Sequence, residues 1–503
     1  MTSHMRATGL LCVVVVLICL GRTPITGAAQ ENGRPQARVG AQRTAITEAL
    51  LKAKPAWRKR PLVGDLQVTA LYAECGGQAV CLLAYDVCEM TRREIPPLKS
   101  AVAEAIGIRA ECVHVFCSHT HSSSMDDTEH DAETLTAISI SAARGAKDGV
   151  VEVEDVAFLR VDTGKQFGIS RRTAHGQFGT WCLMQSRGCV DNGEMVDGTQ
   201  WVRNRLGAYG ATPEEVATID GPIAATREND PHLDLILFPK AGGGYAGGLV
   251  RFTAHPVICS AGYWKPNLGR DYPGPLCDRL SKKYGCPVLF LQGPCGDHRS
   301  RHRDVGLAER DRIGLGLAEA LIARAEQIAS YPFDRLDHAC RTIQCRLREA
   351  VPASEEEANQ WARGAEKDLE QLPHGTDWLG KRKQLAELRA FYRNAAKVHA
   401  GTSYLTREEA KDRRAPLTVS HIAFGRVHLL NFPGELFSTV TRGLDSAADG
   451  PTVVVSFADG VTGYLMPEDD LAQGGYESTW ALFAPESIWG MRTAALELLH
   501  AFD

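Results

Sequence analysis

The sequence lacks the motifs of several common enzyme and metal-site classes. It contains no Gly-x-Ser-x-Gly elbow and no His-Glu-x-x-His motif, which argues against a serine hydrolase of the elbow type and a helical metalloprotease. No two cysteines have Cys-x-x-Cys spacing, so a zinc ribbon is not indicated. The glycines within 242–248 are not followed by Lys-Ser/Thr, and we interpret them as turn residues of a hairpin.

An excess of positive charge is also missing. The chain has 56 Lys and Arg against 61 Asp and Glu, a net charge of -5, and no basic stripe with interleaved aromatics. We therefore expect no nucleic-acid partner. With 503 residues and 44% hydrophobic content the chain is long enough for a large core, and it shows no internal repeat.

The apolar run near the N-terminus, Leu10–Leu20, is shorter than the roughly 20 residues that span a bilayer. Arg6 precedes this run and Gly27-Ala28-Ala29 follows it, which is the pattern of a cleaved secretory signal. An uncleaved anchor helix is the alternative. We expect a signal peptide at 1–29, a mature chain at 30–503 that forms one large or two modest domains, and a secreted or periplasmic protein.

The chain contains 15 cysteines, of which thirteen would remain after signal removal. In an exported protein, Cys182 with Cys189 and Cys340 with Cys345 are candidate disulfide pairs. Because the count is odd, at least one thiol stays free or pairs between chains. We interpret most of the others as small buried hydrophobes within strands.

Strand-like and helix-like segments alternate along the chain, which predicts an α/β fold, a mixed sheet with helices packed on it. Leu66–Tyr72 and Val80–Val87 are typical of a hairpin, and Ile95–Ile106 has helical spacing. Further strands are expected at Cys112–Cys117, Val156–Asp162, Leu233–Phe238, Leu249–Ala254, Val288–Leu291, Thr418–Phe424, Val427–Phe432 and Thr452–Phe457.

Three longer segments have a character of their own. Phe167–Arg227 is rich in Gly, Arg, Trp and Asn with little periodicity, which indicates a functional loop or lid. Val305–Tyr331 is predicted to be helical. Glu355–Arg414 is predicted to be a charged helical hairpin inserted on the domain surface, with its charges on a solvated face.

The stretch Ser118-His119-Thr120-His121-Ser122 follows the predicted strand at Cys112–Cys117. In extended backbone alternate side chains point the same way, so His119 and His121 are expected to face one side. Two imidazoles at the end of a buried strand can meet a metal or a substrate. For an isolated His-x-His, hydrogen-bonded loop histidines are the alternative.

Other chemistry-bearing residues also lie just past predicted strands. They are His255, Asp297 and Glu435, with Tyr464 in the loop after the last strand. In α/β sheets this edge is where ligands bind. Two imidazoles and a carboxylate are common ligands of catalytic zinc, which lowers the pKa of bound water to about 7. Glu435 after Pro-Gly has an alternative role as the charge at a helix N-terminus.

Taken in order, several stretches resemble the neutral/alkaline (non-lysosomal) ceramidases and their bacterial relatives of unknown substrate. The matching stretches are Ser118–Ser122 (Thr-His-Thr-His-Ser in the family), Phe252–Pro256 (a strand ending in Ala-x-His-Pro), Asp271–Gly274 (Asp-Phe-Pro-Gly), Gly296-Asp297 (Gly-Asp), Pro433–Leu436 (Pro-Gly-Glu-Phe), Tyr464, and Tyr476-Glu477. Weaker similarity extends over nearly the whole mature chain. The resemblance implies the fold of the neutral-ceramidase catalytic domain.

The resemblance also implies a site. The implied zinc (Zn2+) ligands are His119, His255, Glu435 and Tyr464. His121 and Tyr476 would bind the substrate carbonyl or the tetrahedral oxyanion, and Arg171, in Ser170-Arg171-Arg172, would contact the substrate. The implied activity is zinc-dependent hydrolysis of a linear, N-acyl type amide by metal-bound hydroxide. The expected substrate is a small-molecule or lipid-like amide, with peripheral membrane contact as a further expectation and no protein partner indicated.

The sequence departs from the ceramidases proper in two respects. Their Gly-Asp-x-Ser-Pro contains a serine that has been considered catalytic, whereas here Arg299 takes that position and Ser300 follows one residue late. Because the sequence runs to Asp503, shortly after the last motif, we expect it to lack the C-terminal β-sandwich domain of the ceramidases. Both departures favour a bacterial relative whose substrate is not classical ceramide. Arg299 also motivates the alternative of a non-catalytic ligand-binding protein on the same fold.

Overall fold

The computed structural model describes residues 35–123, 132–174, 178–183, 189–191, 194–196, 198–219, 224–225, 229–259 and 267–502. The expected signal peptide, 1–29, lies outside these ranges. Within them, no helix combines the length and the apolar character that crossing a bilayer requires.

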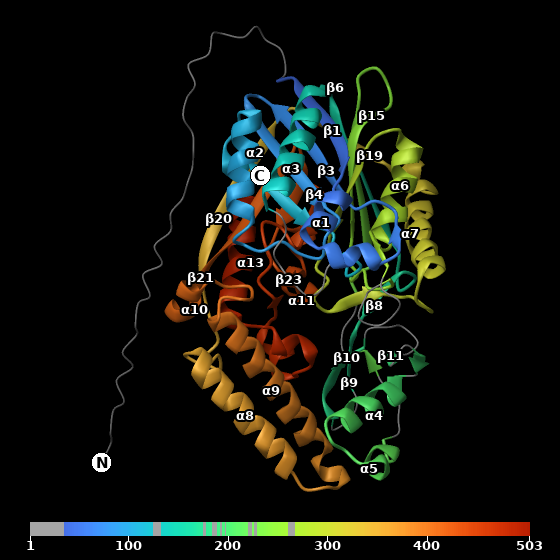
Figure 1. Ribbon diagram of the computed structural model, residues 1–503. Helices are drawn as coiled ribbons and strands as arrows, with labels where there is room; N and C mark the ends of the chain where they lie inside the picture. The colour runs from blue at the N-terminus through green and yellow to red at the C-terminus, as the bar shows by residue number, and fades with distance from the viewer. Residues whose placement is uncertain are drawn as a thin grey trace, which may run out of the picture.

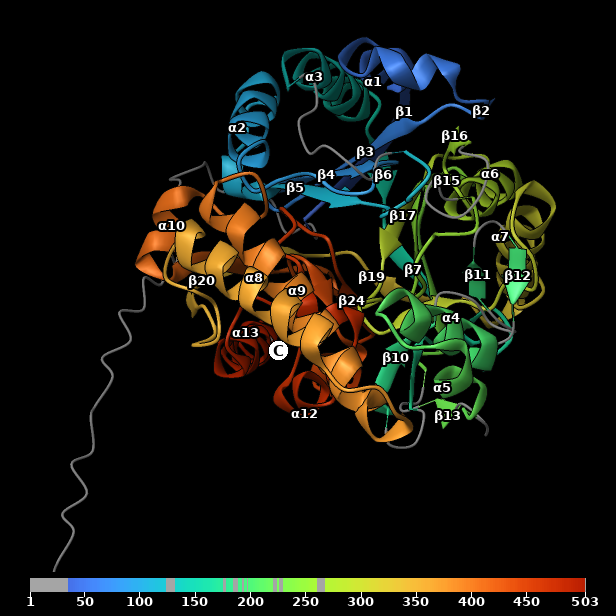
Figure 2. The ribbon, with the colours of Figure 1, turned by 60° about the horizontal axis from the view of Figure 1, so that its bottom comes forward.

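Two five-stranded sheets and one four-stranded sheet form the centre of the molecule (Figures 1 and 2). The first sheet has the order β5-β4-β3-β1-β6, with bounds Val113–Cys117, Gln78–Tyr85, Gln67–Cys75, Ala37–Ala45 and Val151–Val153. The second has the order β17-β15-β14-β7-β19, with bounds Val288–Gln292, Tyr245–Phe252, His232–Pro239, Asp155–Asp162 and Ala329–Pro332. The third has the order β20-β21-β22-β24, with bounds Leu336–Arg346, Arg414–Phe424, Val427–Asn431 and Thr452–Val455.

All three sheets are mixed in the same way. Each contains one parallel pair, β4 with β5, β15 with β17, and β22 with β24, and its other pairs are antiparallel. A parallel pair needs a crossover connection, and in the first two sheets a helix supplies it. The mixed α/β class predicted from the sequence is confirmed. The predicted hairpin of β3 and β4 is confirmed as well.

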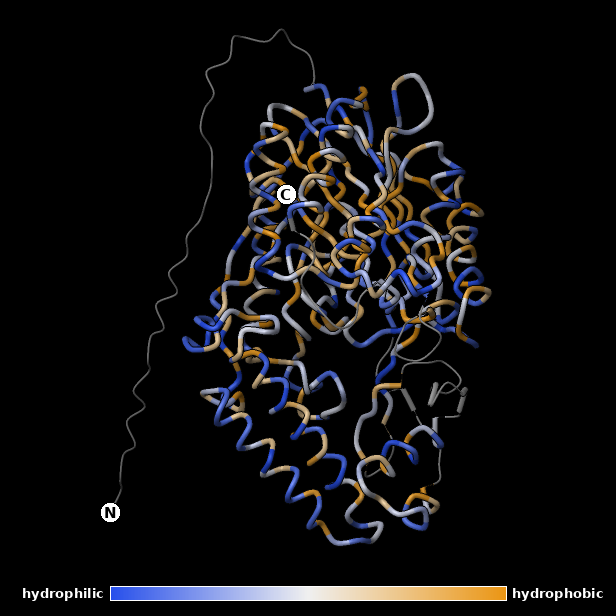
Figure 3. Tube along the Cα trace, in the orientation of Figure 1, coloured by the Kyte–Doolittle hydropathy of each residue, from blue (hydrophilic) through white to orange (hydrophobic). Residues whose placement is uncertain are grey.

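One hydrophobic cluster lies where the three sheets meet. Leu71, Phe238 and Phe424, one from each sheet, belong to the same buried cluster. A Cβ at Gly247 would lie 3.0 Å from the Cβ of Ala41, so this glycine lets the first two sheets approach closely. Figure 3 shows the resulting concentration of apolar chain in the sheet region.

Helices cover the outer faces of the sheets (Figures 1 and 2). Helices α2 (Ile95–Ile106) and α3 (Ala132–Asp148) pack beside the first sheet, and α6 (Pro273–Tyr284) and α7 (Leu307–Ile322) beside the second. Helix α13 (Pro485–His500) packs against β20 and β21. Each presents a buried stripe of apolar residues to its sheet.

The strands β20 and β19 differ from the sequence-based prediction. Strand β20 was not predicted, because most of its residues are half-buried and its apolar alternation is weak. It forms through pairing with β21 along its whole length, which is a tertiary contact. The helix predicted over Val305–Tyr331 ends at Ile322, and β19 follows because β7 offers it an edge to pair with.

Cys345, like most cysteines whose side chains the structure describes, is a free thiol. Cys340 and Cys345 lie five residues apart in β20, so they point to opposite faces of the sheet and their predicted pairing is wrong. The side chain of Cys189 lies outside the described part of the structure, so the predicted disulfide of Cys182 with Cys189 stays a prediction.

The irregular segment 167–227 contains more secondary structure than its composition indicates. Its described residues form short strands and the helices α4 (Gly198–Ala208) and α5 (Pro213–Ala217). Helix α5 begins with a capping box in which Thr212 and Glu215 bond each other's backbone amides. In Figure 1 these helices and the hairpin of α8 (Glu355–Gln371) and α9 (Leu379–His399) project together below the sheets.

The tip of the hairpin docks on the α5 segment. The Glu215 carboxylate accepts hydrogen bonds from the backbone N–H of Gly375 and from His374 Nδ1. Arg382 is buried and donates to the carbonyls of Tyr209 and Pro373, each at 3.4 Å. The prediction that the hairpin charges lie on a solvated face is therefore wrong at this position.

We predict that Arg382→Ala loosens the hairpin tip. The change removes charge-assisted hydrogen bonds worth about 1.5–3 kcal/mol and leaves buried carbonyls without a donor. Native-state hydrogen exchange of the α8 and α9 amides should accelerate by about 10–100-fold.

Lys381→Ala is the matched control, because this neighbouring side chain is exposed and bonds only Gln384 in the described structure. It should change stability by less than about 0.5 kcal/mol. Equal exchange in the two variants would show that the Arg382 contacts do not hold the tip.

Candidate metal centre

The parallel strands of all three sheets direct their carboxyl ends to one place. Strand β5 ends just before His119, β15 ends before His255, and β17 ends before Asp297. In the third sheet β22 leads to Glu435, which forms the short strand β23 (Glu435–Leu436). Residues far apart in the sequence therefore meet at one sheet edge, as the positions past predicted strands indicated.

His119 is fixed by a hydrogen bond and by ring stacking. Its Nδ1 lies 3.0 Å from the carbonyl oxygen of Cys88, so this nitrogen carries the proton and donates it. Its ring stacks on Phe457 with the centroids 4.0 Å apart. Both residues have left-handed backbone, with φ of 60° and 56°, a conformation that costs non-glycine residues about 1–3 kcal/mol each.

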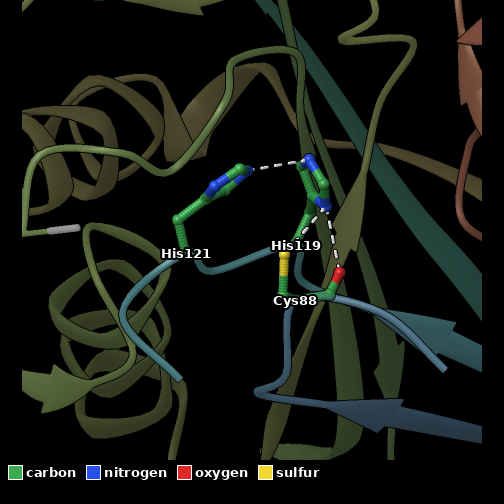
Figure 4. A group of neighbouring side chains, drawn as sticks. All are labelled: Cys88, His119 and His121. Atoms are coloured by element: carbon green, nitrogen blue, oxygen red, sulfur yellow. Dashed lines mark hydrogen bonds between the residues drawn. The ribbon is translucent and has the colours of Figure 1, made fainter. Parts of the chain in front are cut away.

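His121 faces His119, but not through the alternation of side chains in extended backbone that the sequence suggested. The left-handed turn at His119 redirects the chain, and the backbone N–H of His121 donates to the carbonyl of Pro256. The Nε2 atoms of the two histidines then lie 3.1 Å apart. Figure 4 shows His121 at one edge of the His119 ring and Cys88 at the other.

His255 is held in the same way as His119. Its Nδ1 donates to the carbonyl oxygen of His298 at 2.9 Å, which directs Nε2 into the site. Nε2 lies 3.0 Å from Oε2 of Glu435. The same carboxylate oxygen lies 3.7 Å from Nε2 of His119.

These separations fit a zinc ion. With bonds of about 2.0–2.1 Å, a tetrahedral zinc holds nitrogen and oxygen ligands about 3.3 Å apart. Both Nδ1 protons are bonded elsewhere, so the lone pairs of His119 Nε2 and His255 Nε2 face the Glu435 carboxylate. A cation between these converging electron pairs would satisfy them, and two imidazoles with one carboxylate are a common donor set for zinc.

The electrostatics of the site keep the imidazoles neutral. Burial lowers the pKa of His119 and His255 well below the ordinary value, and positive charge on His121 would lower both further. Burial also lowers the pKa of His121 to about 4. At neutral pH all three rings therefore keep a lone pair available for a metal or a proton.

Sulfur donors extend the cluster. The ligand atoms of Cys88, His119 and His121 lie within 4.8 Å of one another, and so do those of His119, His255 and Cys295. Neither thiol was a predicted site residue. A Cys88 beside a buried histidine carries no recognisable sequence spacing, so only the fold brings it there.

Tyr464 lies beside Glu435 in the small parallel pair of β23 and β25 (Tyr464–Leu465). Its Oη accepts a hydrogen bond of 2.8 Å from Arg171 Nη2. Burial raises the pKa of Tyr464 well above its ordinary value, although Arg171 acts in the opposite direction. The structure thus places Tyr464, the fourth predicted ligand, next to the donor cluster. Its hydroxyl is hydrogen-bonded to the Arg171 guanidinium.

Arg171 is fully buried and bonded on most sides. Its Nε donates to Glu477 at 3.0 Å, and its Nη2 also donates to the carbonyl of Gly296. Its Nη1 has no hydrogen-bond partner within the described ranges. Arg172 donates to the second Glu477 oxygen at 2.9 Å, so Glu477 joins both arginines, a role that the sequence did not indicate.

Tyr476 marks the solvent side of the site. It is 49% exposed, and its ring centroid lies 6.1 Å from that of Tyr464. The predicted site residues therefore form a gradient from the buried His119, His255 and Glu435 to the exposed Tyr476.

Asp297 joins two segments next to the site, those of His298 and Ser438. Its Oδ1 accepts hydrogen bonds from His298 Nδ1 and from the backbone N–H of Ser438, and its Oδ2 accepts one from the Ser438 hydroxyl. Arg299, at the position of the family serine, is buried. Its backbone forms an isolated β-bridge with the backbone of His255. Ser300 is completely buried against His302, so its hydroxyl is not presented to a substrate.

Asp459 ties the Phe457 loop to the strand that carries His119. Its Oδ1 accepts from the backbone N–H of Val115, and its Oδ2 pairs with Lys99 at 2.9 Å. His114 Nδ1 lies 3.2 Å from the same oxygen. Burial alone would raise the pKa of Asp459, but Lys99 and His114 outweigh it and hold the pKa below its ordinary value.

Together the fold and the site define an α/β protein with histidine and carboxylate donors gathered at the carboxyl ends of its strands. No known protein-family description matches the sequence, and no curated protein matches it closely enough to report. Four chains of solved structures match it in fold.

The fold is that of the neutral ceramidases. The neutral ceramidase from Pseudomonas aeruginosa superposes with a TM-score of 0.60 and 15% identity, over 94% of this chain and 75% of that chain. A ceramidase complexed with C2 gives a TM-score of 0.60 and 13% identity, over 93% of this chain and 75% of that chain. The ceramidase-like fold expected from the motifs is confirmed.

We predict that Asp459→Asn lowers the free energy of unfolding by about 1.5–3 kcal/mol at pH 7. The folded-state pKa of Asp459 lies below its unfolded value of about 3.9, so its stabilisation is present above that pH and is lost as the pH falls through the folded pKa. The difference from wild type, measured by urea denaturation, should therefore narrow below about pH 4.

Asp449→Asn is the control, because this side chain is 92% exposed. It should leave the unfolding free energy unchanged at either pH. A deficit for Asp459→Asn that stayed constant from pH 7 to pH 3 would refute the ion-pair explanation.

Proposed function

We propose that this protein is a zinc-dependent amidohydrolase that cleaves a linear, N-acyl type amide. The observation that carries the proposal is the convergence of His119 Nε2, His255 Nε2 and Glu435 Oε2, each histidine oriented by a backbone carbonyl behind it. The ceramidase-like fold supports the amide as substrate class.

Zinc would be held by His119, His255 and Glu435, with Tyr464 as the fourth proposed ligand. When bound, the metal supplies Lewis-acid polarisation of a carbonyl and lowers the pKa of water. The protein keeps the imidazoles neutral by burial, so they are ready to bind a cation at neutral pH.

The remaining polar groups act on the substrate. The Nη1 of Arg171 is buried and has no hydrogen-bond partner within the described structure. This group is suited to stabilise negative charge on a carbonyl oxygen. His121, neutral and beside His119, can take up a proton and pass it to the leaving amine. Tyr476, half-exposed beside Tyr464, is proposed to orient the substrate from the solvent side.

The substrate is proposed to be a small-molecule or lipid-like amide other than classical ceramide. Arg299 supports this distinction, because a buried guanidinium replaces the small hydroxyl of the ceramidases. The N-terminal signal pattern supports secretion or periplasmic localisation, where lipid-like amides and peripheral membrane contact are accessible. A non-catalytic ligand-binding protein on this fold remains the rival proposal.

The test is elemental analysis of the purified protein beside a His119→Ala/His255→Ala variant, together with a hydrolysis screen of N-acyl amides. The wild type should hold about one zinc per chain and release amine, and the variant should lose both, because two of the three converging donors are gone. His500→Ala, an exposed histidine on α13, is the control and should keep both.

Two results would redirect the assignment. Zinc without any turnover would favour the ligand-binding protein. A wild type that takes up no metal when zinc is supplied would refute the proposed centre altogether.

A further inference from the structure

Helix α9 has a stripe of polar side chains on a buried face, where an amphipathic helix would place apolar ones. Lys383, Glu387 and Asn394 form this stripe, and Lys383 and Asn394 are only 4% and 8% exposed. An α-helix turns through about 100° per residue, so the three positions lie within about 40° of one another on its surface. Buried polar groups require partners, so the stripe is expected to face polar groups of another segment.

The stripe faces the Tyr476 turn, residues 474–479. Glu387 Oε2 accepts the backbone N–H of Gly475 at 3.3 Å, just before the short 3-10 helix Tyr476–Thr479. At the other end of this turn, Asn394 Nδ2 donates to the carbonyl of Thr479 at 2.9 Å. Helix α9, which runs from the tip of the projecting hairpin back toward the sheets (Figure 1), therefore holds the backbone on both sides of Tyr476.

Lys383 fixes the orientation of the Glu387 carboxylate. Its Nζ lies 2.6 Å from Glu387 Oε1, which leaves Oε2 for the Gly475 N–H. The same Nζ lies 5.0 Å from the centre of the buried Trp181 ring, within the range of a cation–π contact. A largely buried ion pair adds little net stability, because desolvation of the two charges offsets their attraction. The pair is thus better explained by the geometry that it imposes on the turn.

Arg172 holds the same turn from another direction. Its Nη2 donates to the carbonyl of Gly474 at 3.0 Å, and its Nη1 donates to Glu477. Gly474 and Gly475 have φ of 70° and 98°, and a Cβ on Gly474 would lie 3.0 Å from Glu387 Oε2. The two glycines therefore let the backbone approach both Arg172 and Glu387.

We propose that Glu387 and Asn394 are positioning residues for Tyr476, with Lys383 orienting Glu387. The hairpin of α8 and α9 then belongs to the substrate-binding apparatus and is more than a surface insertion. This inference rests on the proposed function for what Tyr476 does to a substrate, whereas its position can be measured without any substrate.

The backbone has to do this work because the Tyr476 side chain is 49% exposed. Packing restrains a half-exposed ring less than a buried one, so the turn determines where its hydroxyl lies. Misplacement of a substrate-orienting group by about 1 Å can cost about 100-fold in rate.

The test compares two double variants that differ only in the group offered to the Gly475 N–H. Lys383→Met/Glu387→Leu replaces the ion pair with apolar side chains of similar volume, a change that is often neutral for stability, and removes the acceptor. Lys383→Met/Glu387→Gln removes the same charges but keeps a carbonyl oxygen as acceptor. Lys381→Ala, an exposed position on the far side of the same helix, is the control.

The position of Tyr476 is followed by fluorine NMR of 3-fluorotyrosine incorporated at position 476 alone, and by hydrogen exchange of a peptide spanning 473–480. In Lys383→Met/Glu387→Leu the Gly475 amide should exchange about 10–100-fold faster, because a charge-assisted hydrogen bond is lost. The single fluorine resonance should broaden or split. The Lys383→Met/Glu387→Gln variant should restore both signals toward those of wild type. Asn394→Leu should broaden the resonance independently.

The catalytic readout uses an amide that the hydrolysis screen finds to be cleaved. Lys383→Met/Glu387→Leu should raise KM by about 10-fold or more, and by more than it lowers kcat, because Tyr476 is proposed to orient the substrate. It should keep about one zinc per chain and the wild-type urea midpoint. Lys383→Met/Glu387→Gln should recover KM, and Lys381→Ala should match wild type throughout.

Each other outcome counts against a stated part of the proposal. An unchanged fluorine resonance and unchanged exchange in Lys383→Met/Glu387→Leu would overturn the positioning role, and so would a displaced ring with unchanged KM and kcat. Equal loss of stability in both double variants would show a merely structural role and overturn it as well. Should Lys383→Met/Glu387→Leu not fold, Asn394→Leu decides by the same measurements.

Failure of the proposed function gives a different result. If the wild type cleaves no amide in the screen, the proposed function is overturned, and the fluorine and exchange data alone decide whether α9 positions Tyr476.

Discussion

The hydrogen bonds from Nδ1 of His119 and His255 to backbone carbonyls are the constraint on which the site depends. Each bond selects one tautomer and one ring orientation, and each carbonyl belongs to a segment that follows another strand or turn. The sheets must therefore be assembled before either imidazole can present Nε2 to Glu435. Conversely, no single segment of the chain carries enough of the site to bind a metal alone, so metal affinity and tertiary structure are expected to be coupled.

A second buried network joins this centre to the parts that project from it. Glu477 binds Arg171 and Arg172 with its two oxygens, and Arg172 also donates to the carbonyl of Gly474. All three charged side chains are essentially inaccessible to solvent. Removing one partner from such a network leaves a buried charge, which is costly, so the network fixes a unique geometry more than it adds stability. Because Tyr476 is adjacent to Glu477, these buried charges also fix the backbone position of the exposed Tyr476.

Much of this arrangement could be predicted from the sequence, because strands β5, β15 and β17 contain short apolar runs and predicted site residues follow them closely. The same reasoning placed His119 and His255 at one edge. The prediction failed where tertiary contacts determine the structure. Strand β20 has little apolar alternation and forms by pairing with β21. Arg382 is buried against the segment that contains Tyr209, more than 160 residues away in the chain. Cys295 could not be found because its proximity to both histidines follows from a backbone turn and carries no spacing signal.

Alkylation of the buried thiols can report which parts of the molecule open. Buried thiols lie in the first and third sheets, in helix α6 and in the turns beside the site. A thiolate reacts only when reagent reaches it, so each cysteine becomes reactive at the rate at which its surroundings open. Cys81, Cys277 and Cys345 lie in three different structural units and would be alkylated together only if those units open as one. The cysteine pattern thus provides, without any engineering, a way to distinguish cooperative unfolding from independent breathing of the sheets.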